Sequence, residues 1–331
     1  MTRWRSTSRN WKARSASLVR AARRLPVVLL LVLLGATSGP AAPPAHAGKA
    51  AALSVWRSGA WHPWWRADRA PERWSAPDTL LTHALDWKRL APGLEWATLR
   101  LSCPAPAWGA RLIVARLDPR KVTLSLTMAM TRDQRPAWSI DSAPEEAILA
   151  VNAGQFVGGM PWGWVTIDGR QLLRPGAGPL STAIAVDAAG RVHWAHGGST
   201  PTAAPARLGF QSYPTLLSGD GVVPASLRTG QGGLNLTHRD ARLAVGETRD
   251  GMLLVVLTRF DALGEFTGSI PLGPTTPEMA AIMGALGARD AAMLDGGISA
   301  QLLLRDPARR DPLRWPGWRK VPLALIARPN R

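Results

Sequence analysis

Four short clusters of glycine and polar residues have the composition expected of a site that does chemistry. They are residues 151–156, residues 161–164, the region of Arg242, and residues 294–299. Each lies at one end of an apolar run, where a turn exposes backbone and side chains to a cleft. Taken singly, each is also an ordinary turn or loop, because Asp-Gly-Gly and Asn-Ala-Gly are common turn sequences. Whether these clusters form a functional site therefore depends on whether the fold brings them together.

Several other kinds of site find no support in the sequence. It has no G-x-x-x-x-G-K-[ST] phosphate loop, no H-E-x-x-H zinc motif and no G-x-S-x-G nucleophile elbow. The six His are not at metal-ligand spacing, and no set of acidic residues resembles a calcium loop. The sequence thus requires no cofactor, and a divalent cation such as Ca²⁺ is not derivable from it. The single cysteine, Cys103, excludes an intramolecular disulfide framework, and we interpret it as structural.

The elements that must position the clusters are mainly strands. Alternating apolar and polar residues between turn residues predict a series of short strands. They cover residues 94–101, 111–117, 122–130, 164–167, 182–186, 191–194, 242–248 and 252–257. We expect the turns at 118–120, 187–190 and 249–251 to close hairpins, and Asp168-Gly169 to form a turn after its strand.

The clearest helix is expected over residues 277–286. Thr275 or Thr276 can cap it, Pro277 suits its first turn, and apolar residues recur at helical spacing as far as Leu286. A weaker helix is expected over 144–149. These elements together predict an α+β fold, with a mostly antiparallel mixed sheet and one or more packed helices in a single catalytic-type domain.

The N-terminus has the three parts of a secretory signal peptide. Residues 1–24 hold eight Arg or Lys and no acid, residues 25–36 are apolar, and small residues end in Ala45-His46-Ala47. We expect cleavage after Ala47 and export to the periplasm or the medium, with an uncleaved membrane anchor as the alternative. Residues 48–92, rich in Trp and Pro, are expected to be a lead-in packed on a main domain over 93–331.

The net charge of +17 on 331 residues suggests a nucleic-acid partner at first sight. The N-terminal basic stretch supplies eight of these charges, leaving +9 scattered over the rest of the chain. A basic nucleic-acid binder therefore rests on net charge alone, and we expect no nucleic acid as a partner.

Six motifs, read in chain order, resemble the phosphodiester glycosidase family. They are ILAVNAGQF, PWGWVTIDGRQL, STAIAVDAAGRV, QSYPTLLSGDG, RLAVGETRDGMLLVVL and TTPEMAAIMGALGARDAAMLDGGISAQLLL. Their order and spacing over residues 93–328 are far more specific than any one motif. The resemblance implies an exported hydrolase of sugar-1-phosphodiester linkages in envelope or extracellular glycans. Similar domains are common in exported bacterial proteins linked to exopolysaccharides.

The family motifs fall on definite residues of this chain. These are Asn152 and Gly154 in the first motif, Arg242, Ala244 and Gly246 in the fifth, and Asp295, Gly296, Gly297 and Ser299 in the sixth. Three positions depart from the family pattern, namely Gln155, Leu243 and Ile298. A β-branched residue fits poorly at positive φ, so we expect Ile298 to reshape the loop after Asp295 and to alter activity.

The resemblance also implies roles. A sugar-1-phosphodiester has an anionic leaving group, so the site needs a cation on the phosphate and a carboxylate near the anomeric carbon. Arg242 suits the first role, and Asp295 suits the second as nucleophile, general base or charge stabiliser. Glu247 is the nearest second carboxylate in sequence, although strand alternation turns it away from Arg242.

The remaining motif residues are expected to bind substrate. Backbone N–H groups at Gly296 and Gly297 can approach phosphate or sugar oxygens, and Asn152 can hold a sugar hydroxyl. Gly154 and Ser299 are the other two residues that we expect to bind substrate. A second reading is a non-catalytic protein that binds glycans or assists exopolysaccharide assembly through the same cleft. Intact Arg242 and Asp295 favour the enzyme, whereas the departures at Gln155 and Ile298 favour the binding protein.

Overall fold

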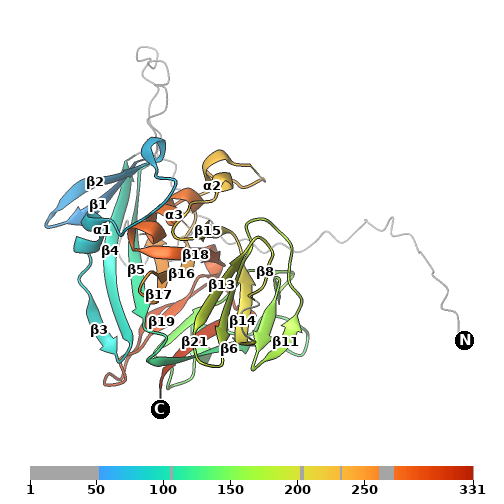
Figure 1. Cartoon of the computed structure of the whole chain (residues 1–331). Coiled ribbons are helices and arrows are strands. Elements are labelled where there is room, and N and C mark those ends of the chain that lie inside the picture. The colour runs from blue at the N-terminus through green and yellow to red at the C-terminus, as the bar shows by residue number, and fades with distance from the viewer. Residues whose placement is uncertain (1–51, 105–106, 202–204, 232, 261–271, 331) are drawn as a thin grey trace, which may run out of the picture. The chain divides into compact units, whose positions relative to one another are not determined.

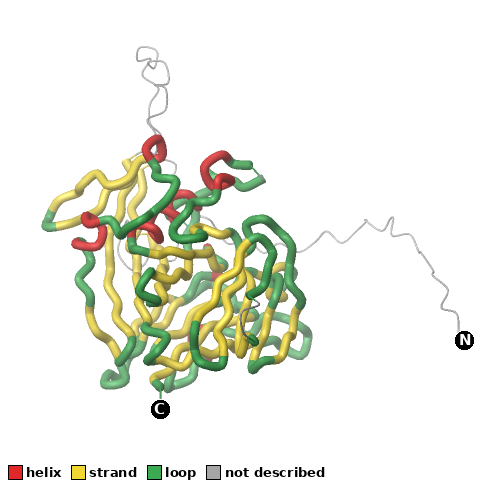
Figure 2. The backbone as a smooth tube through the Cα atoms, viewed as in Figure 1, coloured by secondary structure: helices red, strands yellow, loops and turns green. Residues whose placement is uncertain are grey.

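One large antiparallel sheet forms the centre of the structure (Figures 1 and 2). The structure is a computed structural model that describes residues 52–104, 107–201, 205–231, 233–260 and 272–330. Within these residues the sheet has nine strands. Their order is β15 (Thr215–Leu217), β18 (Ala288–Leu294), β16 (Leu243–Thr248), β17 (Leu253–Phe260), β5 (Ala107–Leu117), β4 (Leu94–Pro104), β1 (Ala52–Arg57) and β2 (Ala60–Arg66), with β3 (Lys88–Ala91) paired to β4.

Two five-stranded sheets and one short hairpin account for the other described strands. The first sheet has the order β11 (Arg170–Leu173), β10 (Val165–Ile167), β14 (Ala206–Ser212), β12 (Thr182–Asp187) and β13 (Val192–His196). The second has the order β20 (Leu313–Trp315), β19 (Leu302–Leu304), β7 (Leu149–Asn152), β21 (Leu323–Pro329) and β6 (Val122–Met128). The hairpin joins β8 (Phe156–Val157) to β9 (Met160–Pro161).

Helices are few and short in the described part of the chain. The α-helices are α1 (Thr79–His83), α2 (Ala225–Thr229) and α3 (Thr276–Ala285), and single 3₁₀ turns occur at η1 (Ala67–Arg69), η2 (Ile140–Ser142) and η4 (Gly297–Ser299). The fold therefore consists mostly of antiparallel sheets with few helices, as the sequence predicts.

Both faces of the large sheet are buried. On one face, Leu112 and Val114 of β5 join a core that includes α3. On the other face, Ile113 and Ala115 of the same strand join a core shared with the two smaller sheets. Side chains alternate across a strand, so an apolar run buried on both faces produces this arrangement. The result is a rigid base from whose strand ends the polar clusters project.

Helix α3 confirms the clearest helical prediction. Thr275 is its N-cap, and a capping box joins Thr275 to Glu278. The helix is buried almost all round, not only along one stripe, because residues from the N-terminal part of the chain cover its outer side. A Cβ at Gly284, for example, would lie 2.2 Å from the ring of Trp74.

Three of the local strand predictions are confirmed. Strands β12 and β13 form one hairpin, and β16 and β17 form another. The strand ending at Ile167 turns at Asp168-Gly169 and pairs with β11. Each of these connections has a glycine at positive φ in its turn.

Two local predictions are wrong. The strands either side of residues 118–120 do not form a hairpin, since β5 pairs with β4 and β17 while β6 pairs with β21 in another sheet. The turn itself forms, because the Asp118 carboxylate accepts the backbone N–H of Arg120 (3.1 Å), but the chain changes sheet there. The expected helix over 144–149 is a turn that leads into β7. A helix of so few residues is only marginally stable, whereas pairing in the sheet stabilises the extended conformation that begins at Leu149.

The residues that precede β4 extend the large sheet. β1 pairs with β4 and with β2, and β3 pairs with the other part of β4. All described residues belong to a compact unit that spans Gly48–Arg331. The predicted signal peptide, residues 1–47, lies outside the described residues.

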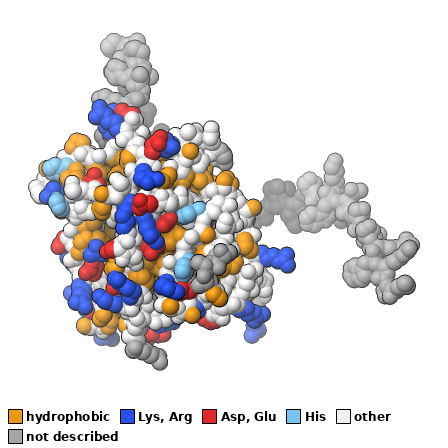
Figure 3. All heavy atoms as spheres, in the orientation of Figure 1, with side chains coloured by type: hydrophobic (Ala, Val, Ile, Leu, Met, Phe, Trp, Pro, Cys, Tyr) orange, Lys and Arg blue, Asp and Glu red, His pale blue; other side chains and the backbone are white. Residues whose placement is uncertain are grey.

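The surface shown in Figure 3 carries Lys and Arg side chains interspersed with Asp and Glu. Basic side chains do not gather into one continuous area on this face. Among the described residues, no helix has the length and apolar character needed to cross a membrane.

Candidate active site

A cavity of about 530 Å³ opens where separate segments of the chain meet. Its walls come from the loop after β18, from the segment that leads into β16, and from Thr276 at the start of α3. Gln155, which follows β7, Arg319, which precedes β21, and Tyr213 and Pro214, which lie between β14 and β15, also line it. The cavity thus unites Asp295 with Arg242, which are separated in the sequence by the strands β16, β17 and β18 and the helix α3.

Asp295 is held firmly at the end of β18. Its backbone N–H donates to the carbonyl of Gly154 (2.9 Å), and its carbonyl accepts from Asn152 Nδ2 (2.9 Å). Its carboxylate accepts from Arg319 Nη2 (3.1 Å) and from the Ser299 hydroxyl. Burial raises the pKa of Asp295, and the bonds from Ser299 and Arg319 oppose that rise. The result is an oriented carboxyl group that is more basic than one on the surface.

A second carboxyl group, Asp240, lines the same cavity. Burial raises its pKa, and the nearby charge of Arg242 lowers it in part. The two carboxyl groups also interact, because the charge of Asp240 raises the pKa of Asp295. Oδ1 of Asp240 accepts from the N–H of Ala241 (2.8 Å), and Oδ2 lies 3.7 Å from His238 Nε2. Buried carboxyl groups with raised pKa values are typical of acid–base sites.

Arg242 is a half-buried cation held by neutral groups. Its Nε donates to the carbonyl of Pro274 (2.9 Å), and its Nη2 donates to the carbonyl of His238 (2.6 Å). Burial lowers its pKa, which the charge of Asp240 opposes. Among the described residues no carboxylate forms a direct ion pair with it, so its charge is available to an anion in the cavity.

The two glycines after Asp295 allow two loops to approach closely. A Cβ at Gly296 would lie 2.5 Å from the carbonyl oxygen of Ala241, and one at Gly297 would lie 2.9 Å from Asp240 Oδ2. The N–H of Gly297 donates to that same Ala241 carbonyl (2.7 Å). This N–H is therefore committed to the protein. Gly296 and Gly297 both line the cavity, and their role in substrate binding stays a prediction. The glycines serve to place Asp295 beside Asp240 and Arg242.

Asn152 and Gly154 also support the site without lining it. The Asn152 side chain is fully buried; its Nδ2 donates to the Asp295 carbonyl, and its Oδ1 accepts the N–H of Gln301 (3.0 Å). The prediction that Asn152 binds a sugar hydroxyl is therefore wrong, because the amide is already used by the backbone. Gly154 has a φ of +68° and gives its carbonyl to the Asp295 N–H. Ser299 does line the cavity, and its Oγ accepts from Arg319 Nε (2.5 Å).

Glu247 does not belong to this cavity. It lies near the far end of β16 from Arg242, opposite Asp290 in the neighbouring strand, and pairs with Arg289 Nη2 (3.2 Å). The prediction of Glu247 as the second carboxylate is therefore wrong. Proximity in sequence is a poor guide along a strand, where each residue adds more than 3 Å.

The three departures from the family pattern are all accommodated. Gln155 lines the cavity and donates through Nε2 to the carbonyl of Tyr213 (2.8 Å). Leu243 is buried in the core below the site. The positive φ of the loop falls on Gly297 (+57°), whereas Ile298 sits in the 3₁₀ turn η4 and is 40% exposed at the cavity. Ile298 is therefore not the residue at positive φ, and its effect on activity stays a prediction.

Asp240, Arg319 and His238 also line the cavity, although the sequence motifs do not single them out. Asp240 could have been found, because it lies two residues before Arg242 and so on the same side of an extended segment. Arg319 carries no comparable signal, since only the fold brings it to Asp295. Its guanidinium also lies 4.7 Å from the ring centre of Phe156, which fixes it from the other side. Within the described residues no group of three His, Cys, Asp or Glu could hold a metal ion.

A family model described as phosphodiester glycosidase matches residues 145–328, more than half of the chain. The chain belongs to the phosphodiester glycosidase family. This family consists of glycosidase-type hydrolases, and the matched region contains Asp240, Arg242, Asp295 and Arg319. No curated protein gives a significant sequence match.

Two solved structures share the fold of this phosphodiester glycosidase domain. One is the zebrafish N-acetylglucosamine-1-phosphodiester alpha-N-acetylglucosaminidase catalytic domain, auto-inhibited by its pro-peptide, with a TM-score of 0.53 and 16% identity. That similarity covers 77% of this chain and 87% of the zebrafish chain. The other is a putative exported protein from Burkholderia pseudomallei, with a TM-score of 0.55 and 14% identity over 78% of this chain and 100% of that chain.

Proposed function

We propose that this protein is an exported hydrolase that cleaves sugar-1-phosphodiester linkages in envelope or extracellular glycans. The observation that carries the proposal is the half-buried guanidinium of Arg242 in a cavity that also holds Asp295 and Asp240. A partly desolvated cation without a direct carboxylate partner among the described residues suits an anionic group of the substrate. The family provides the reaction type.

The leaving group determines what the site must supply. When the sugar–oxygen bond breaks, the phosphate changes from a diester with one negative charge to a monoester that gains a second. Arg242 stabilises this developing charge, so it acts more strongly in the transition state than in the ground state. Asp295 faces the positive charge that develops on the sugar, as nucleophile or as stabiliser. Asp240 is the second carboxyl group and accepts a proton from water.

Arg319 and Ser299 position the first carboxylate. Both donate to Asp295, and Arg319 also donates to Ser299 Oγ, so the three side chains form a closed set of bonds. These donors oppose the rise that burial causes in the pKa of Asp295, and they fix its orientation. Arg319 is therefore a positioning residue, whereas Arg242 faces the phosphate.

Export is part of the proposal. The basic, apolar and small-residue segments of residues 1–47 support a cleaved signal peptide, and the protein would then act in the periplasm or outside the cell. A shift of the mature N-terminus to residue 48, measured by mass spectrometry of the secreted protein, tests this directly.

The reaction is tested by incubating purified protein with α-linked sugar-1-phosphodiesters. UDP-N-acetylglucosamine and a sugar-phospho-sugar are suitable, and release of free reducing sugar is followed. Time-dependent release supports the hydrolase. Saturable binding of the same compounds without release would instead support a non-catalytic glycan-binding protein.

The identity of the second carboxylate can be tested with a matched pair of variants. We expect Asp240→Asn to lower kcat about 10²-fold, because the amide cannot accept a proton from water. Glu247→Gln should leave kcat unchanged, since Glu247 lies outside the cavity beside Arg289. Steady-state kinetics on one phosphodiester substrate measure both. A larger loss for Glu247→Gln than for Asp240→Asn would reverse the assignment.

The pH profile should report the environment of Asp295. If ionised Asp295 is required, activity falls as pH decreases through its pKa, which burial places above the ordinary Asp value. Arg319 lowers that pKa, so Arg319→Gln should move the acidic limb of kcat/KM to higher pH. Arg319→Lys keeps a positive charge and should move the limb less. An acidic limb that stays in place in Arg319→Gln would show that another group controls it.

A further inference from the structure

The order of the strands gives the candidate active site two unlike sides. β18, which leads into Asp295, lies between β15 and β16 in the large sheet (Figure 1). Arg242 immediately precedes β16, on one side of β18. Tyr213 lies just before β15, on the other side, and the carbonyl of the next residue, Pro214, accepts the N–H of Met293 in β18 (3.0 Å). Arg242 and Tyr213 therefore line the cavity on opposite sides of Asp295.

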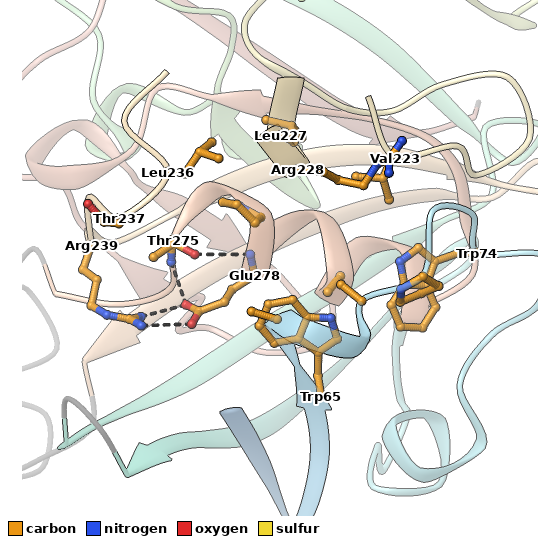
Figure 4. A pocket seen from close by; sticks show the side chains of 15 residues that line it. Trp65, Trp74, Val223, Leu227, Arg228, Leu236, Thr237, Arg239, Thr275 and Glu278 are labelled. Carbon is orange, nitrogen blue, oxygen red and sulfur yellow. Dashed lines mark hydrogen bonds and ion pairs between the residues drawn. The ribbon is translucent and has the colours of Figure 1, made fainter. Parts of the chain in front are cut away.

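The Arg242 side carries ionic groups. Residues 238, 240 and 242 line this cavity, whereas residues 236, 237 and 239 of the same segment line a neighbouring one (Figure 4). There Arg239 donates to both carboxylate oxygens of Glu278 (2.7 and 2.9 Å), which holds the segment from its other face. Asp240 and Arg242 thus present their charges to the active-site cavity, and an anionic phosphate fits beside Arg242.

The Tyr213 side is neutral, with Gln155, Pro214 and Met293 beside it. Burial raises the pKa of Tyr213, so its phenol stays protonated at neutral pH and can donate. No hydrogen bond joins this hydroxyl to a described residue, and it is not among their buried unpaired atoms, so it is open to solvent. The same is true of Gln155 Oε1, while Nε2 of that amide donates to the Tyr213 carbonyl (2.8 Å). This side therefore offers neutral hydrogen-bonding groups to a ligand.

Trp162 supports both residues. Its ring centre lies 6.2 Å from that of Tyr213, with the ring planes at 60°, and its N–H donates to the Gln155 carbonyl (2.7 Å). Trp162 does not itself line the cavity. Tyr213 and Gln155 are thus joined to each other and to a common support. An aromatic ring with neutral polar groups beside it suits a sugar, which has C–H groups on its faces and hydroxyls at its edge.

We propose that Tyr213 and Gln155 form the subsite for the sugar that the enzyme releases, and that this sugar is neutral. The assignment rests on the proposed function, because it takes the phosphate to lie at Arg242 and the anomeric carbon at Asp295. The sugar ring then points away from Arg242, toward Tyr213. A uronic acid would place its carboxylate among neutral groups and lose hydration there, since Arg319 is already paired with Asp295.

Tyr213 is the only tyrosine in the chain, so protein labelled with ¹³Cζ-tyrosine gives one signal that needs no assignment. We expect one or more of glucose, galactose, mannose and N-acetylglucosamine to move this signal in a saturable way. Inorganic phosphate, which binds beside Arg242, should move it at least fivefold less. The proposal is overturned if none of these sugars moves the signal, or if phosphate moves it as far.

Tyr213→Phe keeps the ring and removes the hydroxyl. We expect it to lower kcat/KM about fivefold, mainly through KM, the usual effect of one neutral hydrogen bond away from the scissile bond. The loss should be the same with UDP and with methyl phosphate as leaving group. Thr123→Val is the matched control, because it removes a hydroxyl that donates to Asn330 (2.9 Å) outside the cavity, and it should leave kcat/KM unchanged. An unchanged kcat/KM in Tyr213→Phe, or a loss that depends on the leaving group, would overturn the assignment.

The neutrality of the sugar is tested with two pairs of substrates, UDP-glucose with UDP-glucuronic acid and UDP-galactose with UDP-galacturonic acid. We expect the neutral member of a pair to be cleaved at least tenfold faster, and equal rates within a pair would overturn this part. The two levels of inference can fail separately. Sugars that move the Tyr213 signal without release from any phosphodiester would refute the proposed reaction alone, whereas release with an unmoved signal would refute the subsite alone.

Discussion

The Asp295→Asn variant is expected to release sugar about 10³-fold more slowly than the wild-type protein. The amide has the shape of the carboxyl group, and Arg319 and Ser299 can still donate to its oxygen, so the geometry of the site is kept. It cannot attack the anomeric carbon, accept a proton, or carry the negative charge that stabilises a positive sugar ring. The loss should appear in kcat, with little change in substrate binding.

The same variant should fold at least as well as wild type at neutral pH. Burial raises the pKa of Asp295 above its unfolded value, so the ionised group opposes folding above that folded pKa, and this cost is absent below the unfolded pKa. Urea unfolding at pH 7 checks this. Loss of activity in Asp295→Asn therefore cannot be attributed to unfolding if the midpoint stays equal or rises.

Asp220→Asn is the matched control for Asp295→Asn. Asp220 lies outside the cavity and pairs with Arg249 (3.0 Å), with 59% of its side chain exposed. Its replacement should leave the rate unchanged. Equal release by wild type and Asp295→Asn would remove Asp295 from the mechanism and would leave the cavity without its central residue.

Local signals in the sequence predicted local structure well. The capped helix α3 and the β12–β13 and β16–β17 hairpins depend on caps, spacing and turn glycines within a few residues. The false hairpin at 118–120 shows the limit of such signals. Its turn residues do form a turn, but which strand each arm pairs with is decided by the rest of the fold.

The candidate active site shows the same contrast between features that local sequence predicts and features that only the fold determines. The motif positions Arg242 and Asp295 were found because they lie at the ends of predicted strands, in motifs that resemble the family pattern. Asn152 was found too but given the wrong role, since a residue that binds the backbone gives the same sequence pattern as one that binds substrate. Arg319 was missed because its contact with Asp295 spans two loops. Only geometry separates the residues that hold the site from those that face its cavity.

Arg242→Gln is expected to lower kcat on sugar-1-phosphodiesters by about 10²–10³-fold. The guanidinium is held by the carbonyls of Pro274 and His238, and no direct ion pair within the described residues neutralises its charge. It should therefore act chiefly on the second negative charge that the phosphate gains as the bond breaks. Arg242→Lys keeps a charge but cannot bridge both carbonyls, so it should recover only part of the rate.

A change of substrate isolates this effect. With an aryl glycoside of the same sugar, the leaving group carries no phosphate, so Arg242→Gln should slow the reaction far less than with the phosphodiester. Arg249→Gln is the matched control variant, because Arg249 also donates to two backbone carbonyls, those of Trp74 (2.7 Å) and Asp220 (3.2 Å), but lies outside the cavity. It should leave both rates unchanged. Equal losses on the two substrates would show that Arg242 holds the cavity together and does not stabilise the phosphate.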